Sequence, residues 1–556
     1  MQINAEEIDS MSVYQKYFKE KTGDNGELLS FTMDYPDNFN FGYDVVDFYG
    51  KEEPDKRAVV WCDMMANTRT FTFRDISVLS NKAANVFLNA GIQKGDRVML
   101  VLKRHYEYWY ILPALHKIGA IAVPGTNMLT EDDFLYRLDM GHIRAVVCTP
   151  QDDVSDRLLI AVDKCKEKPI LWSVRYDIDR FENLTRQIEY ASADLKRIDT
   201  KVNEPMLMYF TSGTTGYPKA VMHDHTYPLG HIITAKYWQQ VEEDGLHFTV
   251  SETGWAKAAW GKIYGQWLCG CAVMVYDFDN FDPKKLTVII KDYGVTSFCA
   301  PPTVYRYLVK KGMSDMPSLK HATTAGEALS PDVFAKFEEM SGIELREAFG
   351  QTESTLILGN FKGYESCPGS MGLASPLYHV EIMKNDGTFA EDGEKGELVI
   401  VPPENGRQLG IFSAYFENDE LYEYVWRDGV YHTGDVAWRD EKGYYFFHGR
   451  KDDVIKTGGY RVGPYEVENV LMEHPAVLEC SVVGIPDKLR GQAIKAYVVL
   501  AAGYEPTNEL MKELRDGCNS RLAEYKWIRR LEFVTEMPKT ISGKIRRVEL
   551  REREEK

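Results

Sequence analysis

Residues 209–221 of the sequence, YFTSGTTGYPKAV, combine the groups that bind a phosphate. The apolar residues 206–210 predict a short buried strand that leads into a loop with glycines. Glycine lets backbone N–H groups approach an anion closely, hydroxyls add donors, and a lysine adds positive charge. The candidate phosphate ligands are Thr211, Ser212, Gly213, Thr214, Thr215 and Lys219.

A solvated surface loop is the alternative interpretation of this segment. The strand that enters the loop and the lysine that closes it favour a phosphate site, because a plain linker gains nothing from either. Gly216 is followed by Tyr217 and Pro218, so the spacing differs from the GxxxxGK[ST] of Walker-type nucleotide binders. The segment therefore predicts a nucleotide site on a fold that is not of the Walker type.

Two later segments supply carboxylates suited to a magnesium nucleotide. In EAFGQTES, Glu353 is the candidate ligand for Mg²⁺, which prefers hard oxygen ligands, and Thr352 is a candidate phosphate contact. In the stretch that runs from TGD to GRKDD, Asp435 can accept both hydroxyls of a ribose and Arg450 can donate to the same sugar. These residues extend the predicted nucleotide site from the phosphates to the ribose.

Together these segments resemble the signatures of the adenylate-forming superfamily, which includes acyl-CoA synthetases, adenylation domains of peptide synthetases and luciferases. The resemblance covers most of the chain from about residue 60 and is greatest to the medium-chain acyl-CoA synthetases. The segment PKTISGK resembles the catalytic loop of the superfamily. A lysine in a glycine-containing turn is ordinarily exposed and inert, but this resemblance makes Lys544 the predicted catalytic residue.

The same resemblance implies roles for residues that spacing alone does not single out. Gly326, Glu327 and Phe349 would lie along the adenine, Trp260 and Gly350 would line the acyl pocket, Gly458, Gly459 and Arg461 would line the CoA tunnel, and Asp452 would be the hinge. Phe349 replaces the usual tyrosine of the family, which preserves stacking on adenine but not a hydroxyl contact. Acetate-specific relatives carry a tryptophan at the position of Gly350, so the glycine favours a longer or branched acyl group.

Length and charge limit the possible architecture and partners. The chain has 556 residues, and because single cores stop growing near roughly 250 to 300 residues, we expect more than one domain. The net charge of −18 argues against nucleic acid or an anionic membrane as the main partner. The basic clusters at 526–530 and 544–547 are expected to be solvated faces, with a site for a phosphorylated ligand as the alternative.

Cysteine usage and hydropathy indicate the compartment. Of the nine cysteines, only Cys269 and Cys271 lie close in sequence, and no second pair completes a metal site. Reduced core thiols in a cytoplasm are therefore expected. The N-terminal segment lacks the features of a signal peptide, and no apolar run approaches the roughly 18 residues of a membrane span. We expect a soluble cytoplasmic protein without stable membrane insertion, and the oligomeric state is left open.

From residue 70 onward the pattern alternates between helix and strand. A helix is expected from a cap at Asp75 to Gly91, and strands are expected at 97–102, 120–123, 145–148 and 170–174. This pattern predicts an α/β fold with a largely parallel sheet covered by helices. By the resemblance, residues 1–450 form an N-terminal adenylation domain with mostly parallel sheets and a small β-barrel-like part, and residues 451–556 form a mobile α+β cap.

The predicted function is an ATP-dependent, AMP-forming acyl-CoA synthetase that activates a medium-chain or branched carboxylic acid through an acyl-adenylate. It implies ATP, Mg²⁺ and CoA as cofactor and co-substrates. The main alternative is a stand-alone adenylation enzyme that loads an amino or aryl acid onto a carrier protein. A luciferase-like oxidase and an inactive nucleotide-binding protein are the others, and the presence of Glu353, Asp435, Arg450 and Lys544 argues against the last.

Overall fold

The computed structural model describes residues 12–211, 218–327, 329, 331–404, 408–458, 460–488, 490–540 and 544–555. These residues form two compact units. The larger unit holds the described residues of 12–211, 218–379 and 402–424, and the smaller unit holds those of 380–401 and 425–555. The smaller unit includes residues from both sides of the predicted domain boundary between 450 and 451, and that boundary stays a prediction.

The first sheet of the larger unit carries the strand that leads into the predicted phosphate loop. In spatial order its strands are β21 (Ala414–Tyr415), β11 (Lys219–Asp224), β10 (Pro205–Thr211), β6 (Ile121–Pro124), β5 (Arg97–Val101), β7 (Ile143–Cys148), β8 (Ile170–Ser173) and β9 (Glu182–Asn183). Pairing is parallel from β10 to β9 and antiparallel at β11 and β21. The predicted strands correspond to β5, β6, β7 and β8.

A second, larger sheet lies in the same unit. In spatial order its strands are β18 (Leu373–Ala374), β17 (Leu356–Gly359), β16 (Leu345–Gly350), β15 (His321–Ala325), β14 (Ser297–Ala300), β12 (Leu246–Thr249), β13 (Ala272–Asp277), β3 (Arg57–Asp63) and β4 (Thr68–Thr72). Pairing is parallel from β16 to β3 and antiparallel at both edges. The predicted α/β class with mostly parallel sheets is confirmed.

Both faces of the second sheet are buried. Val273 and Met274 of β13 point to opposite faces, as successive side chains of a strand do, and each joins a different core. The core of Val273 includes α2 (Phe73–Asn89), α3 (Tyr108–Lys117), α7 (Tyr227–Ile233) and α9 (Tyr264–Leu268), and that of Met274 includes α10 (Pro283–Asp292), α11 (Pro302–Lys311) and α12 (Pro331–Ser341). Further helices are α1 (Phe48–Glu52), α4 (Glu131–Met140), α5 (Val154–Lys164), α6 (Leu184–Tyr190), α8 (Ala256–Gly261) and α13 (Asp419–Val425).

The helix expected to start with a cap at Asp75 begins earlier. Thr72 is the N-cap of α2, and its hydroxyl accepts a hydrogen bond from the backbone N–H of Asp75 at 3.2 Å. The Asp75 carboxylate in turn accepts from the backbone N–H of Thr72 at 2.9 Å, which completes a capping box. The prediction that Asp75 is the cap is therefore wrong, because a carboxylate at the third helical position satisfies the N-cap residue instead.

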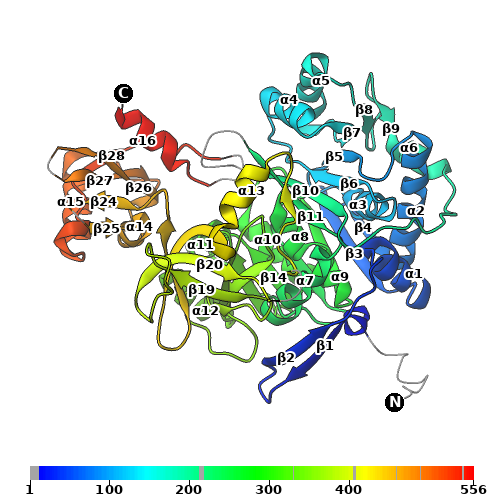
Figure 1. Ribbon diagram of the computed structural model, residues 1–556. Coiled ribbons are helices and arrows are strands. Elements are labelled where there is room, and N and C mark those ends of the chain that lie inside the picture. Colours follow the sequence, from blue (N-terminus) through cyan, green and yellow to red (C-terminus); the bar gives the residue numbers. More distant parts are fainter. Residues whose placement is uncertain are drawn as a thin grey trace. The chain divides into compact units, whose positions relative to one another are not determined.

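The described part of the segment before residue 55 contributes a hairpin. Its strands are β1 (Phe18–Thr22) and β2 (Leu28–Met33), which pair antiparallel (Figure 1). Glu20 of β1 accepts a hydrogen bond from Tyr14 at 2.9 Å and lies 3.3 Å from the ammonium of Lys236. These contacts attach the hairpin to the rest of the larger unit.

The smaller unit contains two sheets. One consists of β19 (His379–Met383), β20 (Lys395–Val401), β22 (Tyr431–Arg439) and β23 (Tyr445–Arg450). The other consists of β25 (Tyr460–Val462), β24 (Ile455–Thr457), β27 (Gly491–Leu500), β26 (Val477–Asp487) and β28 (Arg530–Phe533), with α14 (Pro464–Met472), α15 (Asn508–Ser520) and α16 (Arg547–Glu555) beside it (Figure 1). Pro464 is the first residue of α14, and residues 496–500 belong to β27.

The cysteines and the helices bear on the predicted compartment. All nine cysteines are free thiols, and Cys269 and Cys271 are both buried. Among the described residues, no helix combines the length and the apolar character needed to cross a membrane.

Candidate functional site

Strands β10 and β11 place Lys219 at the end of the predicted phosphate loop. Thr211 is the last residue of β10 and pairs with Lys219, the first residue of β11. The predicted ligands Ser212, Gly213, Thr214 and Thr215 lie outside the described residues. The two ends of the loop are therefore fixed next to each other by the antiparallel ladder.

Glu353 lies beside Lys219. Its Oε1 atom is 2.6 Å from Lys219 Nζ, and the carboxylate is buried, with only 6 % of the residue exposed. Burial alone would raise the pKa of Glu353, but Lys219 and the hydroxyl of Tyr415 outweigh burial and hold this pKa below its usual value. Glu353 is therefore an anion at neutral pH, as a magnesium ligand must be.

Thr352, the neighbour of Glu353, is held through its backbone. His223 of β11 donates a hydrogen bond from Nε2 to the carbonyl oxygen of Thr352 at 2.8 Å. Burial lowers the pKa of His223 to about 4, so the ring is neutral at neutral pH. The ring also stacks on Tyr227, with centroids 3.8 Å apart. Strand β11 thus holds both Thr352 and Glu353 in place.

The predicted acyl-pocket residues Trp260 and Gly350 are in contact. A Cβ atom added to Gly350 would lie 2.3 Å from Cη2 of Trp260 and 2.9 Å from the carbonyl oxygen of Thr355. Trp260 lies on α8 and is buried. The space that the glycine leaves is therefore filled by the indole of Trp260.

The predicted adenine residues are at the ends of two neighbouring parallel strands. Gly326 follows β15 with a φ of 109°, and an added Cβ there would meet nothing within 4 Å. Glu327 is 3.7 Å from Arg306 of α11, and Phe349 is the penultimate residue of β16. Because the carboxyl ends of adjacent parallel strands meet at one edge of a sheet, β15 and β16 bring these residues together.

The predicted ribose ligands pair with each other in the smaller unit. Asp435 of β22 lies opposite Arg450 of β23 in the antiparallel ladder. Nη1 of Arg450 is 3.1 Å from each carboxylate oxygen of Asp435. Asp435 is buried, so the guanidinium compensates a charge that would otherwise be costly to bury.

Lys544 is an exposed residue of the smaller unit. Its backbone N–H donates to Thr540 Oγ1 at 3.1 Å and its carbonyl oxygen accepts from the Thr540 N–H at 2.7 Å. Three residues later Arg547, the first residue of α16, is half-buried against the buried Glu468 of α14, with Nη2 at 2.8 and 2.7 Å from the two carboxylate oxygens. Arg551, also on α16, has its Nη1 atom 2.6 Å from Asp453 Oδ1. The backbone of Lys544 is thus held by hydrogen bonds, while the residue itself is exposed.

The remaining predicted residues of this unit lie in and around the β24–β25 hairpin. Asp452 is an exposed turn residue, Gly458 has a φ of 58°, and Arg461 pairs with Lys456 in the β24–β25 ladder. Gly459 lies outside the described residues. The hinge and CoA-tunnel roles of these residues stay predictions.

Glu466 of α14 joins residues on both sides of Asp452. Its Oε1 atom is 2.6 Å from His448 Nδ1 and 3.0 Å from Lys395 Nζ, and its Oε2 atom contacts Lys526. Burial raises the pKa of Glu466, but the contacts with His448, Lys526 and Lys395 hold it far below its usual value.

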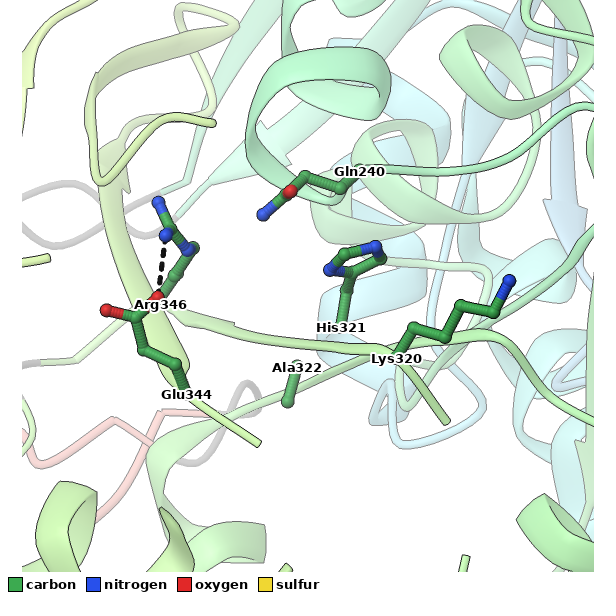
Figure 2. A pocket seen from close by; sticks show the side chains of 6 residues that line it. All are labelled: Gln240, Lys320, His321, Ala322, Glu344 and Arg346. Carbon is green, nitrogen blue, oxygen red and sulfur yellow. Dashed lines mark ion pairs between the residues drawn. The ribbon is translucent and has the colours of Figure 1, made fainter. Parts of the chain in front are cut away.

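A separate pocket of about 210 Å³ lies at the other ends of β15 and β16, lined by Gln240, Lys320, His321, Ala322, Glu344 and Arg346 (Figure 2). Arg346 is 2.6 Å from Glu344, and Lys320 is 2.8 Å from Glu242. Both cations are compensated, and none of the predicted site residues lines this pocket. Within the described parts of the chain, no group of three or more His, Cys, Asp or Glu side chains is arranged to hold a metal ion.

Comparison with known families identifies the class of protein. The family described as "AMP-binding enzyme" matches residues 47–415, and the "AMP-binding enzyme C-terminal domain" matches residues 466–544. The chain belongs to the AMP-binding enzyme family. The two matches together include every predicted site residue except Asp435, Arg450, Asp452, Gly458, Gly459 and Arg461.

Relatives within the family narrow the class. The mitochondrial acyl-coenzyme A synthetase ACSM3 of Rattus norvegicus is 37 % identical over 537 residues, which cover 94 % of this chain and 92 % of the relative. The 4-hydroxybutyrate–CoA ligase 1 of Metallosphaera sedula is 38 % identical over 527 residues, covering 93 % and 91 %. The crystal structure of the anthranilate CoA ligase AuaEII in complex with anthranoyl-AMP has a TM-score of 0.84 at 26 % identity and covers 94 % and 98 %.

These relatives confirm the predicted enzyme class, an AMP-forming acyl-CoA synthetase. Acyl-CoA synthetases use ATP and CoA, so both predicted co-substrates are confirmed at the level of the family. The sequence did not single out Tyr415 or Glu466, and it placed Arg547 only in the basic cluster 544–547, which was expected to be a solvated face. All three residues are identified by their contacts with residues distant in the sequence.

Proposed function

We propose that this enzyme converts a medium-chain or branched carboxylic acid into its CoA thioester, and that it works in the cytoplasm. The observation that carries the proposal is the ion pair between Lys219 and Glu353, because it brings the phosphate-loop segment and the predicted magnesium ligand to one point. The free, buried cysteines support a reducing compartment.

The first half-reaction would form the acyl-adenylate. A carboxylate oxygen of the acid attacks the α-phosphorus of ATP, the bond from this phosphorus to the bridging oxygen breaks, and pyrophosphate leaves. The protein contributes position and charge rather than covalent chemistry. In this proposal Lys219 and the residues of the 211–215 loop hold the outer phosphates, Lys544 neutralises the reacting oxygens, and Asp435 with Arg450 holds the ribose.

Glu353 fits a role as magnesium ligand. It is buried and anionic, and Mg²⁺ commonly takes one or two carboxylates together with phosphate oxygens, so a single protein carboxylate suffices. The bound ion would neutralise charge on the phosphates. Because Lys219 already contacts Oε1 of Glu353, Lys219 would turn from the carboxylate toward the phosphates when the nucleotide binds.

The second half-reaction would transfer the acyl group to CoA. The thiol sulfur attacks the acyl carbon, the bond from this carbon to the AMP oxygen breaks, AMP leaves, and the thiol proton passes to solvent. Gly458, Gly459 and Arg461 would line the path of the thiol, and rotation about Asp452 would exchange them for Lys544.

The contact between Trp260 and Gly350 would influence which acids the enzyme accepts. Since the indole fills the space beside Gly350, the acyl chain would meet a broad flat wall. Such a wall suits a compact, branched acid at the shorter end of the medium range better than a long straight chain.

Pyrophosphate release from MgATP, measured across acids from acetate to decanoate with branched and aromatic members, tests the proposal. We expect turnover that peaks at intermediate or branched acids and depends on CoA. Pyrophosphate release that is independent of CoA would favour a carrier-loading enzyme. No pyrophosphate release with any acid of the panel would contradict the proposal.

A further inference from the structure

Tyr415 lies between the two charged residues of the candidate site. It belongs to the short edge strand β21, which pairs with β11 so that Tyr415 is opposite Val221, two residues beyond Lys219. The residue is 1 % exposed. Its hydroxyl is 2.9 Å from Lys219 Nζ and 2.8 Å from Glu353 Oε1, and Nζ lies 4.6 Å from the centre of its ring.

The chemistry of the three groups fixes the direction of these hydrogen bonds. An ammonium group can only donate, so the Tyr415 hydroxyl accepts from Lys219. Its own proton is then available for Glu353, whose carboxylate can only accept. The hydroxyl therefore serves as acceptor and donor at once, and the ring adds a cation–π attraction for the lysine. Phenylalanine could supply the ring but neither hydrogen bond.

Burial makes the contact with Glu353 important when the lysine moves. A buried carboxylate is costly unless it is paired or hydrogen-bonded. Lys219 is partly exposed, with 26 % of its side chain accessible, and its side chain is long and flexible, so it can turn to a nearby phosphate. Tyr415 is fixed in a ladder and packs against Phe412, with ring centroids 4.7 Å apart.

We propose that Tyr415 is a positioning residue for the adenylation step: it keeps the Glu353 carboxylate oriented toward the metal nucleotide after Lys219 has left it for the phosphates. This inference rests on the proposed function. Tyr415 acts through Glu353 and Lys219 and is not assigned contact with the substrate. Its effect should therefore fall on nucleotide and magnesium binding and on acyl-adenylate formation, and not on the later thioester step.

The test compares Tyr415→Phe with Tyr378→Phe. Tyr378 is a matched control because it is also buried and its hydroxyl lies 2.7 Å from Thr355 Oγ1, within the same unit. Binding of a non-hydrolysable ATP analogue is titrated by calorimetry at several Mg²⁺ concentrations. Pyrophosphate release and thioester formation from supplied acyl-adenylate are then measured separately, and denaturant unfolding is recorded for both variants.

We expect Tyr415→Phe to raise the Mg²⁺ concentration for half-maximal nucleotide binding, and to slow acyl-adenylate formation, by about 10- to 100-fold, the usual effect of removing a partner of a metal ligand. Thioester formation from supplied acyl-adenylate should be unchanged, and Tyr378→Phe should leave the Mg²⁺ dependence unaltered. An unchanged Mg²⁺ dependence in Tyr415→Phe, or an equal loss in both variants, would overturn the inference. The binding titration needs no acid, so it tests Tyr415 even where the wild-type enzyme fails to turn over the panel of acids.

Discussion

The two lysines assigned to the phosphates, Lys219 and Lys544, are held in opposite ways. Lys219 lies in the larger unit on a strand, against a buried carboxylate and a tyrosine hydroxyl. Lys544 is an exposed residue of the smaller unit, and the contacts beside it involve its backbone and the following helix. Under the proposed function, Lys219 would be oriented before the nucleotide arrives, whereas Lys544 would be brought to the nucleotide by the cap.

The largest expected effect comes from Lys544→Ala. Removing a positioned charge that acts in the transition state typically costs about 10²- to 10³-fold in rate, so acyl-adenylate formation should fall by that factor. Thioester formation from supplied acyl-adenylate should persist, and the unfolding free energy should change by less than about 0.5 kcal/mol because the residue is exposed. Lys539→Ala, on the same loop, is the control. An equal loss of both half-reactions would show that Lys544 does not act specifically in acyl-adenylate formation.

Arg547→Met tests how much the ion pair between Arg547 and Glu468, close to Lys544 in the sequence, stabilises the protein. The change leaves the buried Glu468 carboxylate without its guanidinium partner, and breaking a buried pair in this way costs about 3–5 kcal/mol. Unfolding by urea should show this loss. Arg553→Met on the same helix removes only an exposed pair with Glu549 and should cost less than about 1 kcal/mol. Similar values for the two variants would mean that the loop is held by something else.

Trp260→Ala tests the larger unit's role in choosing the acid. Removing the indole opens the space beside Gly350, so the preferred acid should become longer. The ratio of kcat/KM for octanoate to that for a branched short acid should rise by about 10-fold or more, the scale on which apolar pockets discriminate. Trp255→Ala, on the neighbouring turn, is a useful comparison. A shift toward shorter acids would show that Trp260 does not limit the pocket.

The smallest expected effect is a change in how the free energy of unfolding depends on pH when Lys219 is replaced by methionine. In the wild type the folded pKa of Glu353 is lowered, so its stabilising contribution is complete above the unfolded pKa of about 4.3 and is lost as pH falls through the folded pKa. Without Lys219 the raising effect of burial is less opposed, so the folded pKa of Glu353 should rise and the variant should lose stability relative to the wild type as pH rises from about 5 to 7. Urea unfolding of the wild type and the variant at several pH values measures this difference. Parallel plots of unfolding free energy against pH for the two proteins would contradict the prediction.

Local motifs could be predicted from the sequence because their chemistry is contained in a few adjacent residues. Lys219 with Glu353, and Asp435 with Arg450, were assigned to one nucleotide site, and each pair is in contact within its unit. The Asp75 cap was misplaced because the sequence does not distinguish the two members of a capping box. Tyr415 is 196 positions from Lys219, and only the pairing of β21 with β11 brings the two together. The Gly350 prediction missed that Trp260 fills the space, since a contact between distant segments has no local signal.

The carboxylate of Glu466 places a condition on any swing of the cap about Asp452. His448 and Lys395 precede that residue and Lys526 follows it, so α14 can leave β20 and β23 only if Glu466 releases the first two while keeping the third. If the proposed swing occurs, Lys526 would move with Glu466 and would still compensate its charge. The contacts of Glu466 with His448 and Lys395 would be the ones that break.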